Sequence, residues 1–248
     1  MPDRTLQTII LAAGKGSRLQ GTPHPVPKPL AMVGGRPLLE HVLLQAEVAG
    51  CTEAVVVLGS GVEANQVAEH LRSVQTALAV RVVYNRDVDS PNGVSLLAAE
   101  SVANDRFFVQ VADHVFTEFV LSKLEDDAVL PDGAVRLLVD YAPDGIDLED
   151  ATKVQADAGL IRGIGKELAT WDAVDTGCFL MDRRVFDALR AAGRGGSPPT
   201  LSDGMTRLAE AGLLVAVELG DVAWADVDTP ADLARAEGLQ CAGSGVAG

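Results

Sequence analysis

Small and cationic residues follow directly after the first apolar run of the chain. The run from Thr8 to Ala13 is followed by Gly14, Gly16 and Arg18, and Lys28 lies close behind in the string PKPL. Glycines allow the backbone to approach a chain of phosphates and to direct N–H groups at it. Cationic side chains in the same short segment can neutralise phosphate charge. This spacing therefore predicts a phosphate-binding loop.

Two common phosphate-binding loops are excluded by the spacing of these glycines. The dinucleotide fingerprint GxGxxG requires a third glycine where the chain has Leu19, and the Walker A pattern GxxxxGK[ST] does not occur. A tight turn with solvated charges is the alternative interpretation of a lone GxG. The additional lysine of PKPL favours phosphate binding over that alternative.

Three aspartates stand where they could hold a divalent cation close to this loop. Asp113 directly follows the apolar run FFVQVA, so we expect it at the carboxyl end of a buried strand, facing the same crevice as the glycine loop. Mg²⁺ is typically bound by one or two carboxylates together with substrate phosphates. Asp226 and Asp228 are two residues apart in WADVDTP and share a face of an extended chain. Either is a candidate second ligand, with a slight preference for Asp226, whereas His114 is expected to be a packing or supporting residue.

A second segment rich in small residues, PNGVS at residues 91–95, precedes a predicted helix. A glycine at the start of a helix, here Gly93, lets a planar base pack against the backbone. The amide of Asn92 and the hydroxyl of Ser95 could then read the edge of that base. An ordinary helix cap by Asn92 is the alternative, because asparagine is a favoured N-cap residue.

The elements that must position these residues follow from the hydrophobic pattern. Apolar runs of strand length alternate with segments of helical period, which predicts a mostly parallel central sheet with helices on both faces. After about residue 130 the pattern changes, and residues 157–159 are a plausible hairpin turn. Residues 1–240 are expected to form one domain and residues 241–248 a flexible tail or linker. The expected strands are residues 8–13, 54–58, 79–84 and 107–112, and the helices between them are residues 37–49, 62–74 and 92–102.

The composition excludes several classes of protein. Hydrophobic residues make up 48% of the chain, which is enough for a substantial core, and 20 Lys+Arg stand against 35 Asp+Glu, a net charge of −15. Nucleic acids and anionic membranes are bound by positive surfaces, so neither is an expected partner. No apolar stretch reaches the roughly 18 residues of a membrane helix. The three cysteines are widely spaced without a metal or disulfide pattern, so we expect a soluble, cytoplasmic protein.

The string LAAGKGSRL followed by PKPL resembles the signature of the nucleotidyltransferases that join a nucleoside monophosphate to a phosphorylated sugar or alcohol. The resemblance extends over about residues 6–240 and implies an α/β, Rossmann-like fold of the glycosyltransferase-A type. It implies that Arg18 and Lys28 are catalytic groups that neutralise phosphate charge and that Asp113 binds metal. It also implies that the segment around Gly93 lines the base site. The expected nucleotide-binding residues are Leu11, Ala12, Ala13, Gly14, Gly16, Asn92, Gly93 and Ser95.

The middle of the chain narrows this resemblance. The strings ATKV, IGK and VDTG, at residues 151–154, 164–166 and 174–177, resemble the inositol-1-phosphate cytidylyltransferase branch. In that branch these segments form the acceptor side of the cleft, here as a hairpin insertion. The implied acceptor-binding residues are Lys153, Lys166, Asp175 and Gly177. The alternatives are solvated lysines on a hairpin and, for the last two residues, a structural bend in a strand.

Together these features predict a Mg²⁺-dependent cytidylyltransferase that joins CMP from CTP to an inositol 1-phosphate-like acceptor and releases pyrophosphate. A hydroxyalkyl- or aminoalkylphosphonate acceptor is the first alternative, and a sugar 1-phosphate is the next. A non-catalytic nucleotide-binding regulatory subunit is the alternative from another class, and a fused or separate enzyme of the same pathway is a candidate partner. Because loop charges bury little apolar surface, we expect removal of Arg18 or Lys28 to affect activity more than stability.

Overall fold

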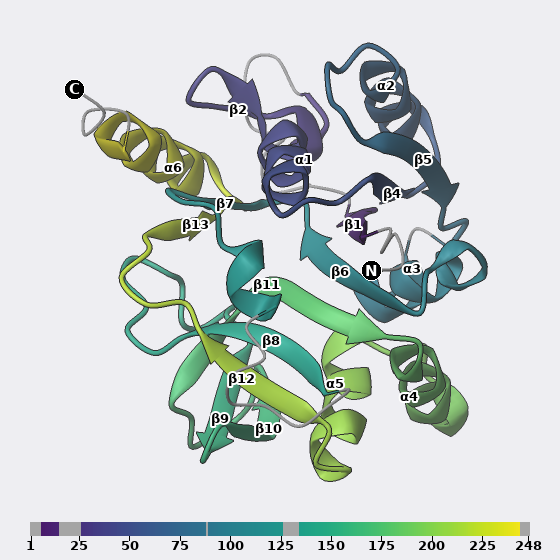
Figure 1. Ribbon diagram of the computed structural model, residues 1–248, viewed down its shortest axis with the longest axis vertical. Coiled ribbons are helices and arrows are strands. Elements are labelled where there is room, and N and C mark those ends of the chain that lie inside the picture. The colour runs from purple at the N-terminus through teal and green to yellow at the C-terminus, as the bar shows by residue number, and fades with distance from the viewer. Residues whose placement is uncertain (1–5, 15–25, 88, 126–133, 244–248) are drawn as a thin grey trace.

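A nine-stranded mixed sheet runs through the middle of the molecule (Figure 1). The computed structural model describes residues 6–14, 26–87, 89–125 and 134–243. The strand order is β5-β4-β1-β6-β11-β8-β12-β10-β9. The strands are β1 (Gln7–Ala12), β4 (Glu53–Leu58), β5 (Ala79–Tyr84), β6 (Arg106–Val111), β8 (Val135–Asp140), β9 (Lys153–Asp157), β10 (Leu160–Gly165), β11 (Ala173–Asp182) and β12 (Leu214–Glu218).

The direction of the strands differs between the two halves of the sheet. β5, β4, β1 and β6 pair in parallel, and β8 pairs in parallel with β12. β11 is antiparallel to β6 and to β8, and β9 is antiparallel to β10. The α/β class is confirmed, but the sheet is mixed rather than mostly parallel, which corrects that part of the prediction. The two-residue connection from β9 to β10 is too short for a parallel crossover, which takes about a dozen residues or more.

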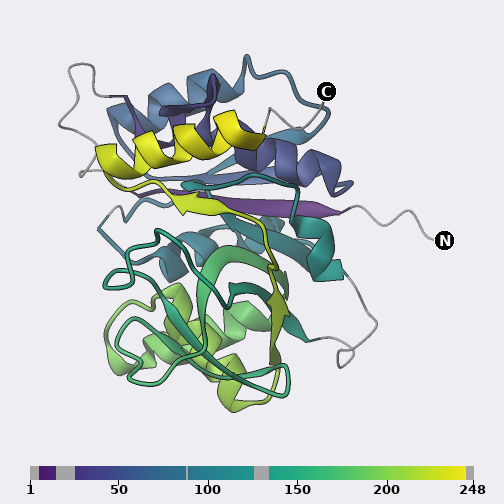
Figure 2. The ribbon, with the colours of Figure 1, turned by 90° about the vertical axis from the view of Figure 1, so that its left-hand side faces the viewer.

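Helices cover both faces of the sheet, as predicted. α1 and α2 pack on one face in a cluster that includes Ile10, and α3, α4 and α5 pack on the other face in a cluster that includes Ile9. Successive residues of a strand point to opposite faces, so the continuous apolar run of β1 fills both clusters. In Figure 2 the dark blue helices α1 and α2 lie above the purple strand β1, and the green elements of the second half of the chain lie below it. The helices are α1 (Leu38–Val48), α2 (Val62–Leu71), α3 (Asn92–Ala98), α4 (Arg184–Ala192), α5 (Leu201–Glu210) and α6 (Pro230–Gly243), with 3-10 turns at Lys28–Leu30, Glu100–Val102, Leu121–Glu125 and Gly193–Gly195.

Two short ribbons flank the main sheet and meet α6. β2 (Met32–Val33) pairs with β3 (Arg36–Pro37), and β7 (His114–Phe116) pairs with β13 (Trp224–Asp226). A third apolar cluster, to which both ribbons and α6 contribute, holds them together. This cluster therefore carries the chain from the end of β6 to the last helix. Its buried members are Ala31, Val33, Leu38, Val115, Ala225, Val227 and Ala236.

The last helix extends further than the sequence indicates. α6 continues through Gly243, so residues 241–243 of the predicted flexible tail are helical, and residues 244–248 lie outside the described residues. Gln240 gives a physical reason, because its side chain donates a 2.9 Å hydrogen bond to the backbone carbonyl of Phe116 and so fixes the last turns of the helix. Within the described ranges, no helix is long and apolar enough to cross a bilayer.

The predicted hairpin turn is confirmed between β9 and β10. Ala158 has a φ of +49° and Gly159 a φ of +80°. A two-residue turn with positive φ at both positions matches the twist of antiparallel strands, which is why it is the favoured connection of a hairpin.

Gly93 has a packing role at the start of α3. A Cβ at this position would lie 2.5 Å from the carbonyl oxygen of Pro199 and 2.8 Å from the carbonyl carbon of Thr200. The neighbouring Asn92 side chain accepts a hydrogen bond from the backbone N–H of Leu201 at 2.8 Å. The first turn of α3 is therefore held directly against the start of α5.

We expect Gly93→Ala to lower the free energy of unfolding by about 1–3 kcal/mol, because its Cβ meets backbone atoms that cannot turn aside. Gly238→Ala is the matched control, since Gly238 lies within α6 with no atom within 4 Å of an added Cβ. Alanine there should raise the unfolding free energy by roughly 0.5–1 kcal/mol. Denaturation in urea measures both changes, and equal stabilities of the two variants would contradict the packing role of Gly93.

Candidate active site

A cavity of about 530 Å³ opens at the carboxyl ends of β1 and β6. These strands pair in parallel with Leu11 opposite Val111, so the residues that follow them meet at one edge of the sheet. Gly14 and Asp113 line the cavity at this edge. Open α/β sheets bind their ligands in the crevice beyond the carboxyl ends of the strands. The other walls come from the 28–30 turn, the loop between β8 and β9, β11, and the segments that begin α5 and α6.

Lys28 is a buried cation in the wall of this cavity. Its ammonium donates to Asp113 Oδ2 at 2.6 Å and to Asp228 Oδ1 at 2.5 Å, and its side chain is 9% exposed. Burial alone would lower the pKa of Lys28, but the adjacent Asp113 carboxylate and hydrogen bonds to both aspartates raise it above its usual value. Lys28 is therefore a buried, paired residue rather than a solvated one, and its removal would leave two carboxylates facing each other.

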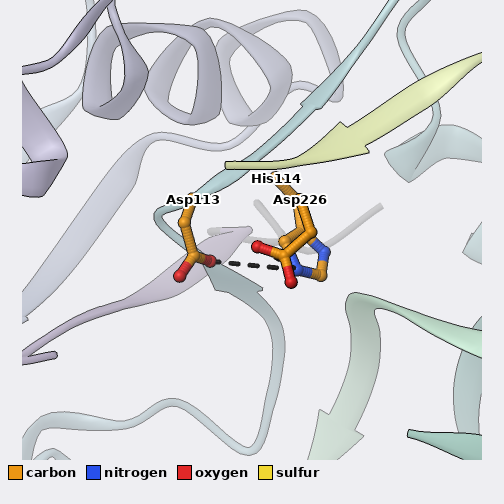
Figure 3. Close-up of side chains that lie close together, drawn as sticks. All are labelled: Asp113, His114 and Asp226. Atoms are coloured by element: carbon orange, nitrogen blue, oxygen red, sulfur yellow. Dashed lines mark ion pairs between the residues drawn. The ribbon is translucent and has the colours of Figure 1, made fainter. Parts of the chain in front are cut away.

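The His114 side chain lies close to the carboxylates of Asp113 and Asp226 (Figure 3). Its Nδ1 donates to the carbonyl oxygen of Thr176 at 2.7 Å, because a carbonyl can only accept. Its Nε2 therefore faces Asp226 Oδ1 at 3.5 Å and Asp113 Oδ1 at 3.9 Å. Burial opposes the charged imidazole, but the Asp226 and Asp113 carboxylates raise the pKa of His114 to about 9. These contacts agree with the packing or supporting role that the sequence indicates for His114, although the sequence does not indicate which carboxylates it contacts.

The ribbon of β7 and β13 explains how Asp226 reaches this site. Asp226 is directly opposite His114 in the antiparallel register, although the two residues are far apart along the chain. Ligand atoms of Asp113, His114 and Asp226 lie within 4.8 Å of one another. Asp228 is held instead by Lys28.

These residues suit a divalent cation. Asp226 Oδ1 is buried and has no hydrogen-bond partner among the described residues, although His114 Nε2 lies 3.5 Å away as an ion-pair partner, so this oxygen can still take a cation as a ligand. Asp113 adds a second carboxylate, whose pKa burial would raise but Lys28 and His114 hold below its usual range. Carboxylate oxygens are the ligands that Mg²⁺ prefers.

β11 bends where it passes the cavity. Its register with β8 shifts between Asp175 and Phe179, and Gly177 has a φ of +72°. A Cβ at Gly177 would lie 2.3 Å from Val111 Cγ2 and 2.8 Å from His114 Nδ1, so glycine allows β11 to approach His114. Asp175 accepts a 2.7 Å hydrogen bond from the Gly177 N–H, and burial raises the pKa of Asp175 to about 6. Both residues line the cavity, so contact with an acceptor is compatible with this structural role and stays a prediction.

The predicted nucleotide-binding residues that the structure describes divide into three groups. Gly14 and Asn92 line the main cavity. Ala12 and Ala13 line a smaller cavity of about 90 Å³ that adjoins it at Gly14 and reaches the start of α2. Leu11, Gly93 and Ser95 are buried and line neither cavity, and Ser95 accepts a 3.1 Å hydrogen bond from the amide of Asn85. Gly16 and Arg18 lie outside the described residues.

The two lysines predicted for the acceptor side differ in their surroundings. Lys166 lines the cavity and its ammonium pairs with the carboxylate of Asp150, a loop residue that carries no signal in the sequence. Lys153 does not line the cavity, and its ammonium donates to the backbone carbonyl of Lys166 at 2.7 Å. The geometry therefore favours Lys166 as a ligand contact and Lys153 as its support.

Comparisons with known proteins agree with this architecture. The family profile described as the MobA-like NTP transferase domain matches residues 8–197. Among solved structures, the chain is similar to the inositol-1-phosphate CTP transferase from T. maritima, with a TM-score of 0.83 and 24% identity over 98% of each chain. The expected nucleotidyltransferase fold is therefore confirmed.

Two curated proteins illustrate the range of relatives. The bifunctional IPC transferase and DIPP synthase of Rubrobacter xylanophilus is 37% identical over 230 residues, which cover 92% of this chain and 50% of that protein. The CMP-5'-(3-aminopropyl)phosphonate synthase of Streptomyces rubellomurinus is 31% identical over 247 residues, which cover 94% of this chain and 38% of that protein. The chain thus spans about half the length, or less, of these curated relatives.

Asp175→Asn is expected to change how stability depends on pH. Because burial raises the pKa of Asp175 from 3.8 to about 6, the folded state binds this proton more tightly, and stability falls as the pH rises through that interval. Asparagine stays neutral and keeps an acceptor for Gly177, so the variant should gain up to about 3 kcal/mol relative to the wild type between about pH 4 and pH 7. Unfolding midpoints across this range test the effect. Asp187→Asn, at a carboxyl that is 81% exposed, should show no such gain.

Proposed function

The chain belongs to the MobA-like NTP transferase domain family, and from this premise we propose that it is a Mg²⁺-dependent cytidylyltransferase. It transfers CMP from CTP to the phosphate of an inositol 1-phosphate-like alcohol and releases pyrophosphate. The choice of CTP is supported by the names of the T. maritima and Streptomyces proteins, which contain CTP and CMP. The acceptor class is supported by the name of the T. maritima protein and by the strings at residues 151–154, 164–166 and 174–177.

The observation that carries this proposal is the Lys28 ammonium between Asp113 and Asp228 at the wall of the cavity. An ammonium has three N–H donors, so Lys28 can hold both carboxylates and donate a third hydrogen bond to a phosphate oxygen. Burial strengthens that contact because the local dielectric is lower than in water. In a chain of net charge −15, such a fixed cation is needed to bind a polyphosphate. We propose the same charge-neutralising role for Arg18.

The chemistry is a substitution at the α-phosphorus of CTP. An oxygen of the acceptor phosphate forms a bond to this phosphorus, while the bond from the phosphorus to the bridging oxygen of the leaving group breaks. Pyrophosphate leaves with that electron pair. Because the acceptor oxygen itself attacks the phosphorus, no covalent bond to the protein is formed. This reaction requires positioning and charge neutralisation rather than a protein nucleophile. Lys28, the aspartates and the backbone N–H groups of the site can together provide this positioning and charge neutralisation.

We propose Asp113 and Asp226 as the Mg²⁺ ligands, with Asp228 as the alternative second carboxylate. The buried Asp226 Oδ1 without a hydrogen-bond partner among the described residues supports this choice. Mg²⁺, when bound, supplies positive charge to the phosphates of the nucleotide. His114 orients the two carboxylates from one side, and Lys28 holds Asp113 from the other.

An aminoalkylphosphonate acceptor is the second candidate. It is favoured by one observation, the 31% identity to the CMP-5'-(3-aminopropyl)phosphonate synthase over 94% of this chain. A phosphonate offers the same attacking oxygen as a phosphate, so the residues proposed for the nucleotide do not distinguish the two. The distinction lies on the acceptor side, where Lys166 and Asp175 line the cavity.

The test is pyrophosphate release with each of the four ribonucleoside triphosphates, in the presence of inositol 1-phosphate, aminopropylphosphonate or glucose 1-phosphate. We expect turnover with CTP and inositol 1-phosphate, its loss on chelation with EDTA, and its return with Mg²⁺. Lys28→Ala should lower kcat by about 10²–10³-fold, as for loss of a charge-stabilising donor. Lys123→Ala, at a lysine that does not line the cavity, is the control. Activity that survives chelation would overturn the metal assignment. If none of the three acceptors supports pyrophosphate release, the proposed transfer is overturned.

The acceptor side gives a separate prediction. Lys166→Met should raise the KM for the acceptor at least about tenfold and leave the KM for CTP unchanged, because a contact made equally in the ground and transition states contributes uniform binding. Lys153→Met should act more weakly, since this side chain reaches the cavity only through the carbonyl of Lys166. Arg162→Met, on the same hairpin and outside the cavity lining, is the matched control. Equal effects of Lys166→Met on both substrates would refute this division of the cleft.

A further inference from the structure

The ribbon that carries Asp226 is short and lies outside the main sheet. β7 and β13 are three residues each and pair with each other in a separate two-stranded sheet. Three residue pairs alone specify the position of a ribbon weakly, since isolated two-stranded pairs are marginally stable. A contact from the main sheet would add to the third apolar cluster a second constraint on the position of Asp226.

Asp140 and Trp224 form such a contact. Asp140 is the last residue of β8 in the main sheet, and its Oδ2 accepts a 2.7 Å hydrogen bond from Trp224 Nε1 in β13. Both side chains are buried, with exposures of 7% and 3%. The other oxygen of Asp140 accepts the backbone N–H of Ala142 at 2.9 Å, so the carboxylate cannot rotate without losing one bond or the other.

Trp224 passes this constraint to the site. Its ring centroid lies 5.1 Å from that of His114 and 6.0 Å from that of Phe116, on which it stacks. Asp226 follows two residues later on the same strand and so lies on the same face as Trp224. Trp224 thus contacts the imidazole that faces Asp226 and Asp113.

We infer that Asp140 is a positioning residue that, through the indole N–H of Trp224, holds the Asp226 carboxylate at the metal-binding edge of the cavity. The inference rests on the proposed metal role of Asp113 and Asp226. An indole N–H buried at 3% exposure must keep its acceptor, because an unpaired buried donor is costly. Without the carboxylate, Trp224 turns or β13 shifts toward another acceptor, and Asp226 moves with it.

The inference is tested by measuring how tightly the protein binds Mn²⁺ in the absence of nucleotide. The electron paramagnetic resonance signal of free Mn²⁺ monitors this binding. Asp140→Asn offers one acceptor oxygen to two donors, so it should raise the Kd for Mn²⁺ about tenfold, at the lower end of the range for groups that hold metal ligands. Asp182→Asn is the matched control. Asp182 also ends a strand and also accepts the backbone N–H two residues on, but its other contact is Arg184 rather than the ribbon.

A double-variant cycle separates positioning from general destabilisation. Trp224→Phe keeps an aromatic ring and removes the indole N–H, so it should also weaken Mn²⁺ binding. The variant with both changes should bind about as well as the weaker single variant, because both changes break the same link. In protein labelled with ¹⁵N-tryptophan, Asp140→Asn should shift the indole signal of Trp224 and leave that of Trp171 in place.

The outcomes distinguish this inference from the proposed function. Wild-type protein that binds no Mn²⁺ would overturn the proposed metal site and the inference with it. Wild-type binding that Asp140→Asn leaves unchanged would overturn the inference alone. Additive losses in the double variant would also overturn it, because they would mean that Asp140 and Trp224 act independently.

Discussion

The burial of one ammonium group between two carboxylates organises the site. Lys28, Asp113 and Asp228 come from three distant parts of the chain, and the two hydrogen bonds at Lys28 join them. A charge removed from water is tolerated only where it is paired, so each of the three segments depends on the other two for its position. The turn after the glycine loop, the end of β6 and the segment before α6 are thereby brought to one wall of the cavity.

The first half of the chain could be predicted well because its information is local. The strands and helices up to β6 follow from hydrophobic period, and Asp113 is found simply because it follows an apolar run. The β9–β10 turn is equally local, since Ala158 and Gly159 lie between two runs of strand type. The burial of Lys28 could not be foreseen, because it depends on carboxylates 85 and 200 residues away.

The second half depends on long-range pairing that sequence patterns do not encode. β7 and β13 are too short to show a period, so the position of Asp226 opposite His114 has no signal in the sequence. The antiparallel course of β11 depends on its contacts with β6 and β8 rather than on its own residues. The same holds for the hydrogen bond between Asp140 and Trp224, which are 84 residues apart.

Glycines at this site serve different purposes. A side chain at Gly93 or Gly177 would collide with other parts of the protein, so packing within the protein explains both residues without a ligand. A Cβ at Gly14 would meet no atom within 4 Å among the described residues, although Gly14 lines both cavities. Packing against that part of the chain does not require glycine there, and close approach of a bound phosphate is the role that we propose for Gly14.

The pairing of β7 with β13 also limits how the chain between β12 and β13 can vary in length. Side chains alternate between the two faces of a strand, so a slip of one residue turns Asp226 away from His114 and brings Ala225 or Val227 in its place. An inserted or deleted residue between Glu218 and Trp224 that shifts this register would thus be more damaging than many substitutions there. A change of two residues would restore the face but not the partner. The number of residues between β12 and β13 is therefore more strongly constrained than their types.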